Sequence, residues 1–137
     1  MKEMKMTKKY NRIFVPNPNH RFDTDTLRDI AKEIVYVCDR PMFDNLMGDE
    51  YIADFEHRIA NRMEDFDPKK DAIAFYGDSM IFAIMIMWIA DNHSEFDLAR
   101  FSTKEGKYMI RRMSYDNFTE QTAVLEQAHS QKRLVVR

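Results

Sequence analysis

The spacing of apolar and polar residues along the chain predicts strands that alternate with helices. Short apolar runs occupy residues 12–15 and 72–76, and a continuous, largely β-branched run occupies residues 34–39. Runs of this length and composition are typical of strands inside a sheet. We therefore expect three strands here, and we expect the strand at 34–39 to be buried on both faces.

Helical spacing appears between and after these strands. Residues 23–33 predict a short helix, and residues 52–66 have apolar positions three and four apart with charges between them. The second pattern is typical of an amphipathic helix that covers one face of a sheet. Residues 80–90 are apolar nearly all round, so we expect a helix buried on more than one side, against the sheet and against a neighbouring helix or a second copy.

The end of the chain predicts a hairpin followed by a helix. Residues 96–102 and 107–113 flank the turn "TKEG", in which Gly106 supplies the positive φ that a tight turn often needs. Residues 117–133 have a thin helical stripe of apolar residues. The order of elements predicts a small three-layer, Rossmann-like α/β sheet with its first three strands parallel, a closing antiparallel hairpin at one edge and an extra C-terminal helix. The pattern leaves the strand order open.

Composition adds that the chain forms one domain. Its 137 residues are 45% apolar and 32% charged, which is ordinary for a globular protein. We divide it into a basic N-terminal arm (1–11), an α/β domain (12–115) and a C-terminal helix with a basic tail (116–137). Cys38 is the only cysteine, which excludes an internal disulfide and a cysteine-rich zinc site and fits the cytoplasm. The N-terminus lacks a secretory signal, and the longest apolar run is too short to span a membrane.

Charge is distributed unevenly. Residues 1–12 hold five basic and one acidic residue, and the last six hold three basic residues, so the net charge of −2 leaves −9 on residues 13–131. An acidic body argues against a nucleic-acid surface on the domain, because such binding rests on phosphate neutralisation. The basic N-terminal arm either contacts nucleic acid or is a solvated tail.

One short motif raises the question of catalysis. "FYGDSM" resembles the Gly-Asp-Ser-Leu block of the GDSL hydrolases at Gly77, Asp78 and Ser79, with Met80 in place of the leucine. Those enzymes supply an Asp-x-x-His pair later in the chain, and the nearest approach to it here is Glu126-Gln127-Ala128-His129. A serine acts as a nucleophile only with a base within hydrogen-bond reach. We therefore interpret the likeness as coincidental. Asp78 or Ser79 then caps the following helix, and Ser79 is the cap we favour.

Polar residues follow each of the first three predicted strands. Because the carboxyl ends of parallel strands meet at one edge of a sheet, a small-molecule site is one hypothesis for this edge. The other is that they are the loop residues any α/β sheet exposes to water. The candidate ligand-binding residues are Asn17, His20, Asp39, Arg40, Gly77, Asp78 and Ser79.

The remaining residues that could take part in chemistry are more typical of core packing or of protein contacts. No two histidines have the spacing of metal ligands, so we expect no metal, and no motif indicates a cofactor. Cys38 is interpreted as a small buried apolar residue. The methionine-rich helix is either core or an adaptable contact surface. Its candidate interface residues are Met80, Ile84, Met87 and Trp88.

Residues 12–115 also resemble small proteins of unassigned activity encoded by tailed bacteriophages. The stretches that carry the likeness are "IFVPNPNHRFD", "FDPKKDAIAFYGDSM" and "ARFSTKEGKYMIRRM". This resemblance implies a viral accessory protein acting in the host cytoplasm. Our main functional hypothesis is a non-enzymatic protein that binds itself or a host or viral protein partner. The alternative is a small-molecule-binding or hydrolytic α/β domain that uses the carboxyl edge of the sheet.

Overall fold

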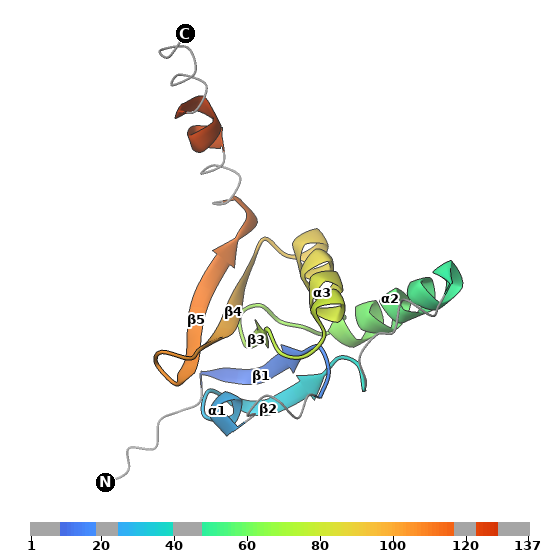
Figure 1. Ribbon diagram of the computed structural model, residues 1–137, viewed down its shortest axis with the longest axis horizontal. Helices are drawn as coiled ribbons and strands as arrows, with labels where there is room; N and C mark the ends of the chain where they lie inside the picture. Colours follow the sequence, from blue (N-terminus) through green and yellow to red (C-terminus); the bar gives the residue numbers. More distant parts are fainter. Residues whose placement is uncertain (1–8, 19–24, 40–47, 117–122, 129–137) are drawn as a thin grey trace.

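The computed structural model describes residues 9–18, 25–39, 48–116 and 123–128, and these build a five-stranded mixed sheet (Figure 1). The strand order is β2-β1-β3-β4-β5. The strands are β1 (Tyr10–Val15), β2 (Ala31–Tyr36), β3 (Asp71–Ala74), β4 (Glu95–Ser102) and β5 (Lys107–Ser114).

The predicted topology is confirmed. Strand β1 pairs in parallel with both β2 and β3, and β4 and β5 form an antiparallel hairpin at one edge. The first strand of the hairpin, β4, is itself parallel to β3, so four strands share one direction. Gly106 in the hairpin turn has a φ of 69°, as the sequence predicted.

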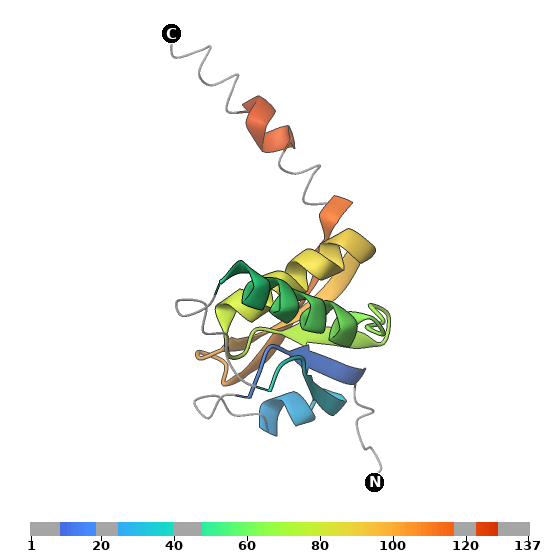
Figure 2. The same ribbon diagram turned by 90° about the vertical axis from the view of Figure 1, so that its right-hand side faces the viewer.

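The helices lie on both faces of the sheet. Helices α2 (Asp49–Met63) and α3 (Ser79–Asn92) pack on one face, over a core that includes Phe14 and Ile73. The short helix α1 (Asp25–Arg28) packs on the other face through Leu27, beside Ile13 and Val15. Figure 2 shows α2 and α3 running side by side above the sheet, with α1 below it. Residues 123–128 are helical, inside the predicted C-terminal helix.

The helix predicted over residues 23–33 is wrong in its second half. Only Asp25–Arg28 are α-helical in the described part of this range, and Ala31 already begins β2. The amide of Tyr10 donates a 3.0 Å hydrogen bond to the carbonyl of Ile30, and Tyr10 is paired with Ala31 across the sheet. Pairing with the inner strand β1 therefore overrides the local helical spacing.

The prediction that the second strand is buried on both faces is also wrong. Strand β2 is an edge strand, and it exposes Lys32 and Glu33. Its β-branched half, at residues 34 and 35, is only half-buried. Charged residues on an edge strand disfavour pairing with another sheet, and the apolar run alone does not reveal that edge position.

Helix α3 is less buried than its composition predicts. Only Ile81, Met85 and Ile89 are fully buried, at spacings of four along one face. Met87, on the opposite side, is 68% exposed. Within one chain α3 is therefore fully buried along one face only, and its exposed side is the one that the expectation assigns to a second copy.

A buried ion pair joins the amino ends of β1 and β3. Asp71 is buried and accepts hydrogen bonds from Arg12 Nη2 at 2.8 Å and from the amide of Asp67 at 2.9 Å. The hydrogen bond with Asp71 raises the pKa of Arg12. Arg12 also reaches the exposed carboxylate of Asp65 at 2.9 Å. This cluster lies at the amino end of the parallel strands, opposite the edge at which the sequence predicts a site.

Candidate functional site at the carboxyl edge of the sheet

The carboxyl ends of β1 and β3 form the point at which the chain changes direction across the sheet. From β1 the chain crosses to β2 on one side, and it later returns to β3 on the other side. In open α/β sheets, the crevice outside such neighbouring strand ends is the usual ligand site. Here the loop after β1 contributes Asn17, and the loop after β3 contributes Gly77 and Asp78.

The side chain of Asn17 fills this crevice. Asn17 is 1% exposed, and its Oδ1 accepts a 2.7 Å hydrogen bond from the amide of Asp78. Its Nδ2 donates to the carbonyl of Pro18 at 2.9 Å. Gly77 has a φ of 89°, and a Cβ placed on it would lie 2.4 Å from Asn17 Oδ1. Glycine is therefore required at position 77 for its backbone conformation and for the close approach of Asn17.

Asp78 caps helix α3. Its Oδ1 accepts hydrogen bonds from the amides of Met80 at 2.8 Å and Ile81 at 3.1 Å. Ser79 is exposed and is the first residue of the helix, so the favoured assignment of the cap to Ser79 is wrong. The first amides of a helix have no partner within the helix and can therefore attract an anion. The carboxylate of Asp78 accepts hydrogen bonds from two of them. Asn17 holds the amide of Asp78 as well, so the chain's own side chains occupy this end of the helix.

Ser79 has no described histidine beside it. His93 caps the far end of α3, about 20 Å away for a 14-residue helix, and its ring contacts Phe66 and Trp88. His57 is exposed on α2. The candidate residues His20 and Arg40 lie outside the described residues. Among the described residues, Ser79 therefore lacks the base that would make it a nucleophile.

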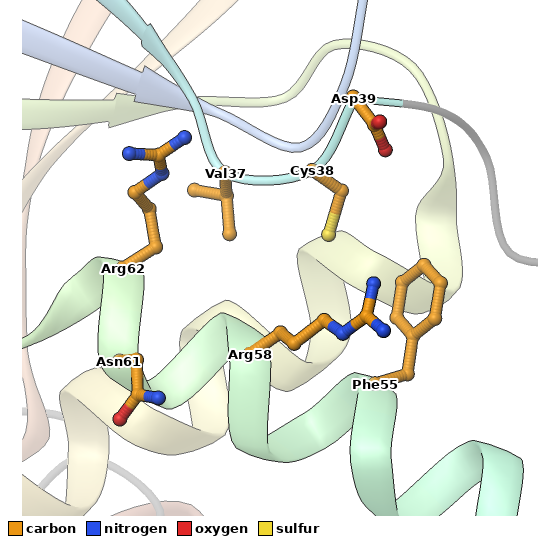
Figure 3. A pocket seen from close by; sticks show the side chains of 7 residues that line it. All are labelled: Val37, Cys38, Asp39, Phe55, Arg58, Asn61 and Arg62. Atoms are coloured by element: carbon orange, nitrogen blue, oxygen red, sulfur yellow. The ribbon is translucent and has the colours of Figure 1, made fainter.

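Asp39 lies at a separate cavity, between the end of β2 and helix α2 (Figure 3). The cavity has a volume of about 450 Å³. One wall is the chain after β2, and the other is one face of α2. Its lining residues are Val37, Cys38, Asp39, Phe55, Arg58, Asn61 and Arg62.

The α2 side of this cavity was not predicted from the sequence. Arg58 and Arg62 are one helical turn apart, and Figure 3 shows both side chains extending from α2 toward the chain after β2. Arg58 also forms a 3.0 Å ion pair with Asp54. The signal available in the sequence was the spacing of these arginines beside the apolar stripe of Phe55 and Ile59, which places them next to the sheet.

Cys38 is a protonated thiol at neutral pH. Burial raises its pKa from 9.0 to about 11, and the negative charges of Asp39 and Asp78 add to the rise, while Arg58 and Arg62 oppose it. Because the thiolate is the reactive form, Cys38 is a poor nucleophile near pH 7. This agrees with its interpretation as an apolar packing residue.

The four candidate interface residues of α3 divide into two pairs. Met80 and Met87 are exposed, whereas Ile84 and Trp88 are half-buried. Ile84, Met87 and Trp88 line a second cavity of about 550 Å³ between α3 and α2, whose rim carries Glu56 and Asp91. The exposed residues of the helix interior form a row that borders this cavity at Met87 and Ala90: Met80, Ala83, Met87 and Ala90.

Comparisons with known proteins add no family to this description. No protein-family model, no curated protein and no solved structure matches the chain. Within residues 9–18, 25–39, 48–116 and 123–128, no three His, Cys, Asp or Glu side chains group as metal ligands do. None of the helices in the described ranges has the length and apolar character needed to cross a membrane.

Proposed function

We propose that this protein is a non-enzymatic assembly protein that binds a second copy of itself through the exposed row of α3. The row, which we call the α3 seam, consists of Met80, Ala83, Met87 and Ala90. The bacteriophage resemblance supports a role as an accessory protein in the host cytoplasm.

The spacing of the α3 seam is the observation that carries this proposal. Its steps of three, four and three residues are those of the a and d positions through which helices pair. Met87 is 68% exposed and Met80 is 47% exposed, although both are large apolar side chains. The two alanines between and beyond them leave room for another helix to approach closely. Exposed apolar surface of this kind marks contact with a partner.

The contact between Asn17 and Asp78 at the carboxyl edge supports a non-enzymatic role. The place where an α/β sheet usually receives a ligand is filled by Asn17, and the start of α3 is capped by Asp78. Of the polar residues predicted at this edge, Asn17 and Asp78 are thus engaged with each other.

Oligomeric state tests the proposal directly. Native mass spectrometry and sedimentation velocity should give a dimer for the wild type, and Met87→Glu should weaken that dimer at least tenfold. His57→Glu is the matched control, because it adds the same charge to an exposed position on α2. A wild-type protein that stays monomeric at high micromolar concentration would contradict self-association. If the two variants weakened the dimer equally, the α3 seam would not be the contact surface.

The arginines of the cavity beside Cys38 favour a second candidate function, the binding of a small anion. Arg58 and Arg62 line the same cavity, and two guanidinium groups are suited to a carboxylate or phosphate. Asp39 lines it too and opposes an anion. Inorganic phosphate should raise the melting temperature of the wild type but not of Arg62→Ala, if this site is used. An equal rise in both proteins would exclude it.

A further inference from the structure

The β4–β5 hairpin has an open groove on the same face of the sheet as α2 and α3. Side chains alternate between the two faces of a strand, and the register pairs Leu98 with Arg111 and Arg100 with Met109. The groove encloses about 450 Å³. The side chains of this face that line it, which we call the hairpin groove, are Leu98, Arg100, Ser102, Met109, Arg111 and Met113.

The hairpin groove combines apolar and basic side chains, since each of these two cross-strand pairs sets an apolar residue opposite an arginine. Leu98 packs against the core below α3, whereas Met109, on the edge strand, is 47% exposed. Arg100 and Arg111 are exposed, and neither forms an ion pair with another described residue.

The opposite face of the same strand is different. There Arg112 is held by Glu95 at 3.2 Å and by Asp97 at 3.1 Å. The positive charge of β5 is therefore neutralised on one face and available on the other. An acidic, amphipathic segment is the partner that matches the available face.

The C-terminal segment of this chain has that chemistry. Residues 114–131 contain Asp116, Glu120 and Glu126 and no lysine or arginine. In the helical stretch 123–128, Val124 is 64% exposed and Leu125 is 58% exposed. This helix thus carries two large apolar residues followed by a glutamate. Neither apolar residue belongs to the described hydrophobic core.

We propose that the C-terminal segment of a second copy lies in the hairpin groove, and that the two copies exchange these segments reciprocally. This inference rests on the proposed self-association and names a contact additional to the α3 seam. Val124 and Leu125 would cover Leu98 and Met109, while Glu120 and Glu126 would neutralise Arg100 and Arg111. The same patch and segment on each copy then form a closed, two-fold symmetric contact.

The segment's own chain does not supply this contact. Figures 1 and 2 both show the helix at 123–128 standing beyond the end of β5, away from the hairpin of its own chain. Residues 115 and 116 are helical immediately after β5, and the sequence has no glycine or proline after Gly106. A return over the groove would have to reverse the chain directly after β5, where the described backbone is helical instead.

Charge reversal in two full-length variants tests the exchange. Arg100→Glu with Arg111→Glu makes the groove acidic, and Glu120→Lys with Glu126→Lys makes the segment basic. Each variant alone then sets like charges against each other, so its dimer should be at least tenfold weaker than that of the wild type. When the two variants are mixed, the acidic groove of one faces the basic segment of the other, and the basic groove faces the acidic segment. Native mass spectrometry of the mixture should therefore show a heterodimer as the main species.

Controls separate this inference from the proposed function. Lys69→Glu with Lys104→Glu changes the net charge as much as the groove variant does, at exposed positions outside the groove, and should leave the dimer unchanged. Variants that dimerise as tightly as the wild type would overturn the exchange and leave the α3 seam standing. A mixture without heterodimer would also overturn the exchange. A monomeric wild type would overturn both proposals.

Discussion

Asn17 and Asp78 are 61 positions apart in the sequence, yet Asn17 Oδ1 accepts a hydrogen bond of 2.7 Å from the amide of Asp78. The bond joins the loop after β1 to the start of α3, across the point where the chain changes direction in the sheet. A buried side chain therefore takes the place that a ligand has in many sheets of this kind. The same contact fixes the position of the helix that we propose for self-association.

Loss of the Asn17 side chain should destabilise the fold. Asn17→Ala leaves the amide of Asp78 without its buried acceptor, which costs about 1–3 kcal/mol. Gly77→Ala should also destabilise, because it puts a Cβ 2.4 Å from Asn17 Oδ1 at a φ of 89°. Chemical denaturation of both variants and of the double variant measures their coupling. Gly77→Ala should cost less in the Asn17→Ala background, and strictly additive costs would contradict the close contact.

The two residues at the start of α3 should respond differently to alanine. Asp78→Ala removes the acceptor for two helix amides and should lower the free energy of unfolding by about 0.5–2 kcal/mol. Ser79→Ala, at an exposed first helical position, should change it by less than about 0.5 kcal/mol. Urea denaturation compares the two. A larger loss in Ser79→Ala would reverse the assignment of the cap.

The two carboxylates on Arg12 should differ in their contribution to stability. Arg12→Met leaves Asp71 buried without its charged partner, and the loss of one partner of a buried pair costs about 3 kcal/mol. Asp65→Ala removes an exposed partner and should cost about 0–1 kcal/mol. Thermal and urea unfolding at low and high salt check both values. Only the small Asp65 effect should fade as salt rises, because screening acts on exposed charges.

The raised pKa of Cys38 should appear in its reaction with an alkylating reagent. The thiol titrates at about 11 in the folded protein and near 9.0 in an unfolded chain. Folding therefore favours the protonated form. This contribution to stability is complete below pH 9 and is lost as the pH rises toward 11.

Mass spectrometry should follow the rate of iodoacetamide addition from pH 7 to pH 11. The native protein should react slowly at pH 7 and still speed up as the pH approaches 11, whereas the same protein in urea should reach half its maximal rate near pH 9. A native midpoint at or below 9 would show that Cys38 is not held as a thiol by burial.

Much of the fold was predictable from short patterns. The apolar runs gave β1 and β3, the alternation of strands and helices gave the parallel sheet, and Gly106 gave the hairpin turn. The predictions were wrong where the neighbouring strand in the sheet decides which secondary structure a segment adopts. Residues 31–33 have helical spacing, but pairing with β1, where Tyr10 lies opposite Ala31, makes them part of β2. The exposure of Lys32 and Glu33 depends on β2 being an edge strand, which local sequence does not encode.

The candidate site was less predictable than the sheet. Loops after parallel strands were expected to bring polar residues together, and Asn17 and Asp78 do meet. That they bond to each other rather than to a ligand depends on Gly77 letting the asparagine approach closely. Arg58 and Arg62 were not selected because on a helix they look like ordinary solvated charges. Only the position of α2 beside the end of β2 places them at a cavity.

The position of β1 inside the sheet, between β2 and β3, also bears on how the chain folds during synthesis. Among the described strands β1 comes first in the sequence, and its two neighbours in the sheet, β2 and β3, are complete by residue 74. A nascent chain can therefore assemble three adjacent strands before the hairpin exists, and each later strand adds to the same growing edge. The last strand added, β5, becomes the edge of the described sheet, so the surface that we propose for a second molecule is completed last.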